Sequence, residues 1–150
     1  LFTIHELQPE IILNHIKRTG YHIEHIFTQS IDELTILINS VKITFLSYLF
    51  KILTPIMLEN LIKMPDLVTL ASMKAYALGK RNKWKDYVDL YFLFKYHVTF
   101  DDVIDKAHSI FGKSFNQKLF REQLCYFDGL DLSEDIFYIK QPSYNIQKTI

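Results

Sequence analysis

The sequence has few of the residues that break or crosslink a chain: four glycines, four prolines and a single cysteine, Cys125, among 150 residues. A single cysteine excludes both an internal disulfide and a cysteine zinc cluster, and it suits a reducing compartment. Scarce glycine and proline, together with 49% hydrophobic residues, exclude a fibrous or disordered chain. We therefore expect a globular, cytoplasmic protein.

The sequence also lacks an excess of charge of either sign and a long apolar run. Seventeen basic and 17 acidic residues cancel, so no net field attracts nucleic acid or an anionic membrane. The most apolar run, residues 41–53, is interrupted by two lysines. It is shorter than the roughly 18 residues that a membrane-spanning helix requires. We expect no contact with a membrane, and any phosphate must be bound by a local cluster of cations.

The first part of the chain, residues 1–64, alternates between strand and helix patterns. Strands are predicted over four segments: residues 1–5, 21–28, 33–38 and 41–48. A helix between the first two strands starts near Pro9 and stops at Gly20, and a hairpin turn at residues 39–40 joins the last two. Residues 52–63 predict a connection with one short strand or turn. Because the chain begins directly in a strand, we expect that it is truncated at its N-terminus.

From Asp66, a good N-cap, the pattern becomes helical. Four helices are predicted: residues 67–80, residues 84–96, a helix from Thr99 or Asp101 to 110, and a helix capped by Ser114 or Asn116 that ends at 127. A last short strand is predicted at residues 136–140. The expected fold is α+β in a single domain over residues 1–150. A small mixed or antiparallel sheet with one helix comes first, and a C-terminal helical bundle follows over residues 65–150.

A pattern of cations and carboxylates links the first two of these helices. On a helical projection Lys74 lies within an aliphatic stripe, and Arg81 extends the stripe by two turns. Asp86 and Asp89 share one face of the following helix, beside aromatic residues. Lysine and arginine are rarely buried unpaired, so Lys74 and Arg81 should meet an anion.

Two interpretations of this pattern stay open. In the first, Lys74 and Arg81 pair with Asp86 and Asp89 and hold the two helices together, an arrangement that is weak evidence for function. In the second, Lys74 binds a nucleotide triphosphate at the rim of a cleft with help from Arg81 or Lys85, and Asp86 orients the cation. The interpretations overlap, because a carboxylate often holds a phosphate-binding lysine in place.

The same residues carry a resemblance to a known family. Leu-Ala-Ser-Met-Lys-Ala-Tyr-Ala-Leu at residues 70–78, then Arg81, then Lys-Asp-Tyr-Val-Asp-Leu-Tyr-Phe-Leu at residues 85–93, resembles the signature of the AbiEii/AbiGii toxin family. Members are nucleotidyltransferase-like toxins of bacterial toxin–antitoxin and abortive-infection systems. Residues 20–47 look like the family's strand meander, and residues 123–128 look like the end of its late helix. The resemblance covers nearly the whole chain.

The resemblance implies a nucleotidyltransferase-like fold and transfer of a nucleotide from a nucleoside triphosphate to an RNA or protein acceptor. It implies Mg²⁺ held by an Asp-x-Asp pair that follows a Gly-Ser turn. In relatives the residues directly after this pair are similar to Leu1-Phe2-Thr3, which places the metal-binding motif upstream of residue 1. A further carboxylate of the family falls at Thr44, whose hydroxyl is a poor metal ligand. We therefore expect no cofactor site in this chain and no activity of the chain alone.

Carried over onto the matching positions, the resemblance implies a catalytic role for Asp86. It implies nucleotide binding by Lys74, Arg81, Lys85 and Asp89, and it assigns no metal ligand. The implied protein partner is a cognate antitoxin. The alternative is a non-catalytic interaction module that keeps the fold and binds a protein. An exposed first strand also predicts edge pairing into a homodimer.

Overall fold

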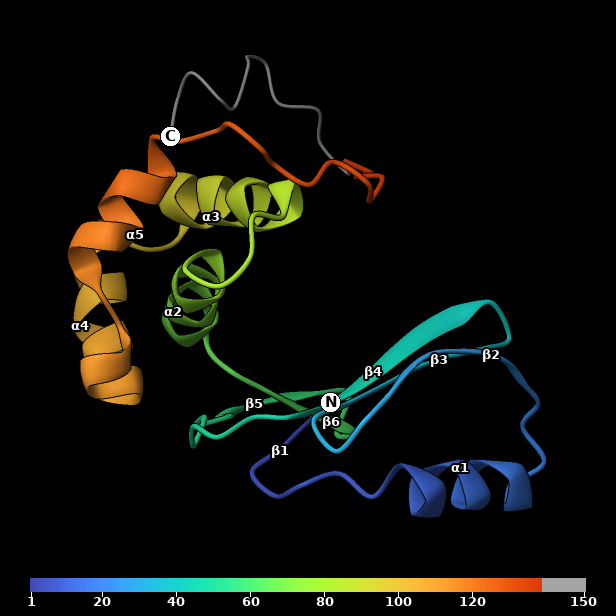
Figure 1. Cartoon of the computed structure of the whole chain (residues 1–150). Helices are drawn as coiled ribbons and strands as arrows, with labels where there is room; N and C mark the ends of the chain where they lie inside the picture. Colours follow the sequence, from blue (N-terminus) through green and yellow to red (C-terminus); the bar gives the residue numbers. More distant parts are fainter. Residues whose placement is uncertain (139–150) are drawn as a thin grey trace. The chain divides into compact units, whose positions relative to one another are not determined.

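The computed structural model describes residues 1–138, and the chain divides into two compact units, the first over residues 1–51 and the second from residue 52 onward (Figure 1). Within the described residues, a four-stranded mixed sheet, a two-stranded sheet and five α-helices form the predicted α+β fold. None of these helices has the length and apolar character needed to span a membrane. The sequence patterns placed the change from sheet to helices after residue 64, whereas the two units divide after residue 51.

The first unit is the four-stranded sheet with one helix, α1 (Pro9–Arg18). Its strands are β1 (Phe2–Thr3), β2 (Ile23–Gln29), β3 (Glu33–Ile38) and β4 (Val41–Ser47). They lie in the order β1-β4-β3-β2, with β1 parallel to β4 and the other pairs antiparallel. The predicted meander of three strands is confirmed, while the strand predicted at residues 1–5 is limited to two residues at an edge of the sheet.

The core of the first unit lies between one face of the sheet and α1. Leu34, Ile36 and Ile38 alternate onto this face and pack with Leu7 and Leu13. Thr35 points to the opposite face, where its Oγ1 donates to Glu33 Oε1 at 2.6 Å and lies 3.0 Å from Oγ1 of Thr44 on β4. The hydroxyl of Thr44 is thus part of a hydrogen-bonded chain across neighbouring strands.

Two hairpin turns use the left-handed backbone region without glycine. The predicted turn between β3 and β4 is confirmed, with φ of 48° at Asn39 and 59° at Ser40. A second hairpin joins β5 (Ile56–Leu58) to β6 (Ile62–Met64), with φ of 48° at Glu59 and 56° at Asn60. Positive φ at both central residues is what a type I′ turn requires. The prediction of one short strand or turn over residues 52–63 therefore missed a strand.

The other named elements of the second unit are helices. Its elements are α2 (Leu67–Leu78), α3 (Trp84–Tyr96), α4 (Phe100–Phe111), the short 3₁₀ helix η1 (Gly112–Ser114) and α5 (Gln117–Leu124). The bounds of α3 are those predicted, and Asp66, Thr99 and Asn116 are confirmed as N-caps. Of the strand predicted at residues 136–140, residues 136–138 are not in a strand and the others lie outside the described residues.

Small residues bring α2 close to its neighbours. Ala71, Ser72 and Ala75 are buried, and Ser72 Oγ donates across the helix contact to the carbonyl oxygen of Val103 on α4 at 3.0 Å. Lys74 lies beside this buried face with its side chain 21% exposed, rather than in the middle of an apolar stripe as the projection predicted.

Candidate functional site

The candidate site lies where α2 ends and α3 begins. A tight turn closes α2, in which the amide nitrogen of Arg81 donates to the carbonyl oxygen of Ala77 at 3.0 Å. Asp86 lies in the first turn of α3, where the helix dipole favours a carboxylate. The turn and the two helices together bring Lys74, Arg81 and Asp86 into contact.

Asp86 is the centre of this cluster, and its side chain is 0% exposed. Lys74 Nζ donates to Oδ1 at 2.9 Å. Arg81 donates through Nε to Oδ2 at 2.9 Å and through Nη2 to Oδ1 at 3.2 Å. This two-pronged geometry is the strongest that an arginine and a carboxylate form, and it fixes the orientation of the buried group. The predicted pairing of these residues is confirmed.

The second carboxylate of the cluster differs from the first in its exposure. Asp89 Oδ2 lies 2.5 Å from Lys74 Nζ, but the Asp89 side chain is 49% exposed. Lys74 is itself 21% exposed. Its amine therefore joins a buried carboxylate on one side to a solvated carboxylate on the other.

The charge state of Lys74 follows from these contacts. Burial lowers the pKa of its amine, but hydrogen bonds with Asp89 and Asp86 outweigh burial, so the pKa lies above the usual 10.5. The amine is protonated at neutral pH. Two cations, Lys74 and Arg81, then balance the two carboxylates, and the cluster carries no net charge.

Lys85 is not brought into this cluster, although the resemblance implied that it binds the nucleotide. Its amine forms an ion pair with Glu134 Oε2, and Lys83 Nζ lies 2.5 Å from Glu134 Oε1. Hydrogen bonds from both lysines lower the pKa of Glu134 from 4.5 to about 2. Sequence reasoning missed Glu134, which is separated from these lysines by 49 and 51 residues and lies in an irregular segment.

The described residues do not fit a resident Mg²⁺. No group of three or more His, Cys, Asp or Glu side chains among residues 1–138 is placed to hold a metal ion. Both oxygens of Asp86 are bonded to Lys74 and Arg81, so this carboxylate has little capacity left for a cation. We therefore derive no step through a metal in this chain.

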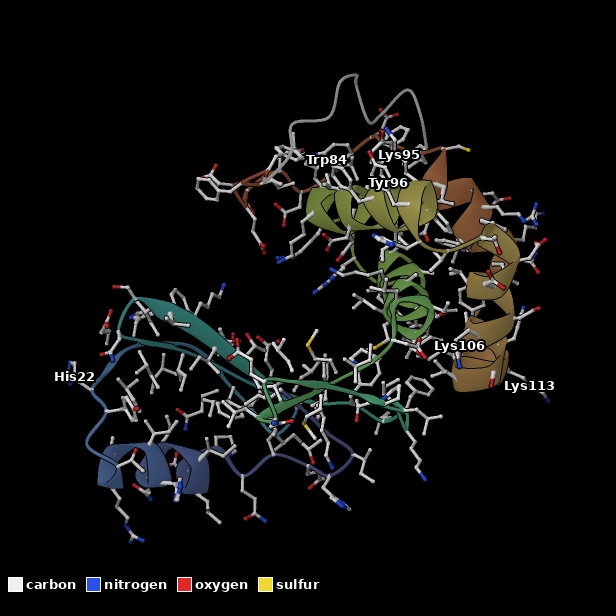
Figure 2. The ribbon with its side chains drawn as sticks, turned by 180° about the vertical axis from the view of Figure 1, so that it is seen from behind. His22, Trp84, Lys95, Tyr96, Lys106 and Lys113 are labelled. Atoms are coloured by element: carbon white, nitrogen blue, oxygen red, sulfur yellow. The ribbon has the colours of Figure 1, made fainter. Side chains whose placement is uncertain are left out.

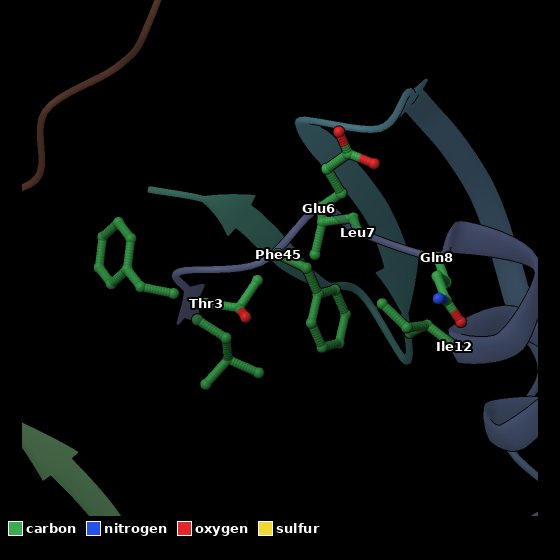
Figure 3. A pocket seen from close by; sticks show the side chains of 8 residues that line it. Thr3, Glu6, Leu7, Gln8, Ile12 and Phe45 are labelled. Carbon is green, nitrogen blue, oxygen red and sulfur yellow. The ribbon is translucent and has the colours of Figure 1, made fainter. Parts of the chain in front are cut away.

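A separate hollow of about 310 Å³ lies in the first unit (Figure 3). Its lining is mostly apolar, with Phe2, Leu7, Ile12 and Phe45, and Glu6 supplies a carboxylate at the rim. It contains no basic side chain. None of the predicted nucleotide-binding residues lines this hollow.

No protein-family model, curated protein or solved structure matches this chain. The resemblance of residues 70–93 to the AbiEii/AbiGii signature therefore stays a prediction. The cluster of Lys74, Arg81, Asp86 and Asp89 is a finding of the structure that does not depend on it.

Proposed function

We propose that the cluster around Lys74 binds the triphosphate of a nucleoside triphosphate, and that the chain is a nucleotidyltransferase-like toxin component of a bacterial toxin–antitoxin or abortive-infection system. The observation that carries the proposal is the position of the Lys74 amine between the buried Asp86 and the exposed Asp89. The family and the nature of the ligand rest on the resemblance of residues 70–93.

The two carboxylates have different roles in this proposal. Asp86 is buried and held by Arg81 through two hydrogen bonds, so it keeps Lys74 aimed and is a positioning residue. Asp89 is half exposed, and opening a solvated ion pair costs about 0–1 kcal/mol. A phosphate oxygen can replace the Asp89 carboxylate on the Lys74 amine, since lysine binds phosphate as a point charge.

Binding alone does not complete a transfer reaction. The sequence contains no Asp-x-Asp pair and no Gly-Ser dipeptide, the motif that the resemblance requires for the metal ions. We expect no nucleotidyl transfer by this chain alone. Incubation with labelled nucleoside triphosphates, magnesium and a tRNA pool tests this, and label on RNA or on protein contradicts it.

Thermal unfolding of the full chain with each nucleoside triphosphate tests the binding site. A nucleotide present at about 100 times its dissociation constant stabilises the folded state by about 2.7 kcal/mol. Lys74→Met should abolish the stabilisation, and Asp89→Asn should strengthen it by removing the competing carboxylate. The matched control is Lys80→Met, which removes an exposed lysine just beyond the same helix. The proposal fails if no nucleotide raises the melting temperature, or if Lys74→Met keeps the full effect.

A second candidate is the non-catalytic interaction module that binds a protein such as a cognate antitoxin. The closed charge balance of the cluster favours it, because both cations already have carboxylate partners and need no ligand. In this case nucleotides leave the melting temperature unchanged, and replacing Lys74 lowers only the stability of the fold.

A further inference from the structure

A second cavity, of about 60 Å³, lies within the second unit between α2 and α5. Its buried lining residues include Ala75, Phe115 and Phe120, which are apolar. Four exposed lining residues mark its mouth: Lys80, Ser114, Asn116 and Leu119. No residue of the Lys74 cluster lines this cavity, so it is separate from the proposed nucleotide site.

One polar atom in the lining has no partner. Gln123 Oε1, on α5, is fully buried and accepts no hydrogen bond within the described part of the chain. A buried carbonyl oxygen without a donor costs free energy, because it has lost water and gained nothing in its place. Gly79 follows α2 and leaves space beside this oxygen, since a Cβ at that position would lie 3.8 Å from it. A hydrogen-bond donor that enters the cavity therefore meets an unused acceptor.

The volume of the cavity limits the size of its occupant. A water-sized group needs about 10–15 Å³ of such a volume, so about 60 Å³ holds roughly four to six of these groups. A drug-sized ligand, which needs roughly 300 Å³ or more, is too large. The cavity therefore suits a group of about four heavy atoms.

The charges around the cavity disfavour an ionic occupant. Lys80 lies at the mouth, with Nζ 5.4 Å from the centre of the Tyr76 ring, and no Asp or Glu is among the described lining residues. Lys113, which precedes the lining Ser114, adds a second positive charge at the end of α4 (Figure 2). A cation would be buried without a counter-ion, and an anion would meet the lone pairs of Gln123 Oε1. A neutral group that carries a hydrogen-bond donor is therefore favoured.

We propose that this cavity is a binding site for a small neutral ligand that carries a primary amide. The side chain of Gln123 holds an acceptor and a donor next to each other, and a primary amide supplies the same pair in reverse. The amide nitrogen of the ligand donates to Gln123 Oε1, which then no longer lacks a partner. The apolar part of the ligand contacts Phe115 and Phe120 in the buried lining.

Four planar compounds with four heavy atoms each test the chemistry of the site: acetamide, acetone, acetate and acetamidinium. Acetone lacks the N–H donor, acetate carries a negative charge, and acetamidinium carries a positive charge. Each compound is titrated into the full chain at constant ionic strength, and ¹H–¹⁵N spectra follow the backbone amides around the cavity and the side-chain amide of Gln123.

Acetamide should bind with a Kd on the order of 1–10 mM, as expected for a ligand of this size. The other three compounds should bind at least about tenfold more weakly, because each loses the donor or brings an unpaired charge into the cavity. The proposal is overturned if acetamide causes no saturable shifts, which would leave water as the only occupant. It is also overturned if any of the other three compounds binds as tightly as acetamide.

Gln123→Met removes the acceptor and keeps the approximate length of the side chain. It should weaken acetamide binding by about tenfold or more. It should not lower the melting temperature, because it also removes an unpaired buried oxygen. Gln117→Met is the matched control on the same helix, outside the lining, and should bind acetamide as the wild type does. Unchanged binding in Gln123→Met overturns the proposal, as does an equal loss in Gln117→Met.

Gly79→Ala tests the space in the cavity and leaves Gln123 in place. The backbone φ at Gly79 is −67°, which alanine adopts, and the new Cβ would lie 3.4 Å from the Tyr76 carbonyl oxygen. The variant should fold with at least the stability of the wild type, since alanine restricts the unfolded chain more than glycine does. The methyl group narrows the approach to Gln123 Oε1, so acetamide binding should fall by about tenfold or more. Wild-type binding in this variant places acetamide elsewhere and overturns the proposal, even if Gln123→Met fails to fold.

Discussion

The two lysine–carboxylate clusters of α3 have the same chemistry but opposite solvation. Asp86 is fully buried, and its partners lie 5 and 12 residues away in the sequence. Glu134 is 36% exposed, and its partners lie 49 and 51 residues away. A buried carboxylate that loses a partner has no water to replace it, whereas an exposed one does. The first cluster therefore fixes the helices, and the second can open with a smaller loss of stability.

The largest expected effect is on the buried cluster. Asp86→Ala should lower the free energy of unfolding by about 3–5 kcal/mol, because it removes the buried carboxylate that pairs with both Lys74 and Arg81. Urea denaturation followed by circular dichroism measures the loss, with Asp105→Ala on the exposed face of α4 as the control. A loss no greater than that of the control would remove the distinction between the two clusters.

Alkaline pH tests the same cluster through Lys74. Because the pKa of Lys74 is raised above 10.5 in the folded state, its stabilising contribution is complete below that pH and is lost as the pH rises through the folded pKa. Lys74→Met should itself cost about 1.5–3 kcal/mol at neutral pH. The variant should lose less stability than the wild type as the pH rises above 10.5. Parallel curves for the two proteins would show that Lys74 does not contribute through its charge.

The smallest expected effect is on the exposed cluster. Glu134→Gln should cost no more than about 1 kcal/mol in global stability. The pKa of Glu134 falls from 4.5 to about 2 on contact with its lysines, so the contact is at full strength above pH 4.5 and weakens as the pH falls toward 2. Trp84 emission should change over this range in the wild type and not in Glu134→Gln. The same emission change in both proteins would assign it to other acidic groups.

The elements that were predicted well from the sequence are those with local sequence signals. The aromatic and apolar spacing of α3 gave its bounds, and the cap at Asp66 gave the start of α2. One strand of the hairpin β5–β6 was missed because Ile56, Met57 and Leu58 do not alternate with polar residues, and Glu59 is an uncommon residue for the left-handed region. The pairing of β2 with β3 is also interrupted by two register shifts, one between Ile23 and His25 and one between Ile26 and Thr28, and the sequence pattern indicates neither.

The candidate site also has one contact that local sequence signals predict and one that they do not. The contact of Lys74 with Asp86 was predictable, because both lie on neighbouring helices whose facing residues follow from a step of about 100°. Lys85 was grouped with them because it is close in sequence, but it reaches Glu134 instead. No local pattern could pair these two, since residues 131–138 form no helix or strand and their contacts depend on tertiary packing.

The β5–β6 hairpin has a consequence for the behaviour of the protein in solution. Six of its apolar side chains are between 37% and 81% exposed: Ile56, Met57, Leu58, Leu61, Ile62 and Met64. An apolar two-stranded sheet offers its edges to other copies of the molecule. The formal net charge is zero and the isoelectric point is about 7.2, so electrostatic repulsion between molecules is weakest near neutral pH. Colloidal stability should therefore improve when the protein is kept well away from that pH.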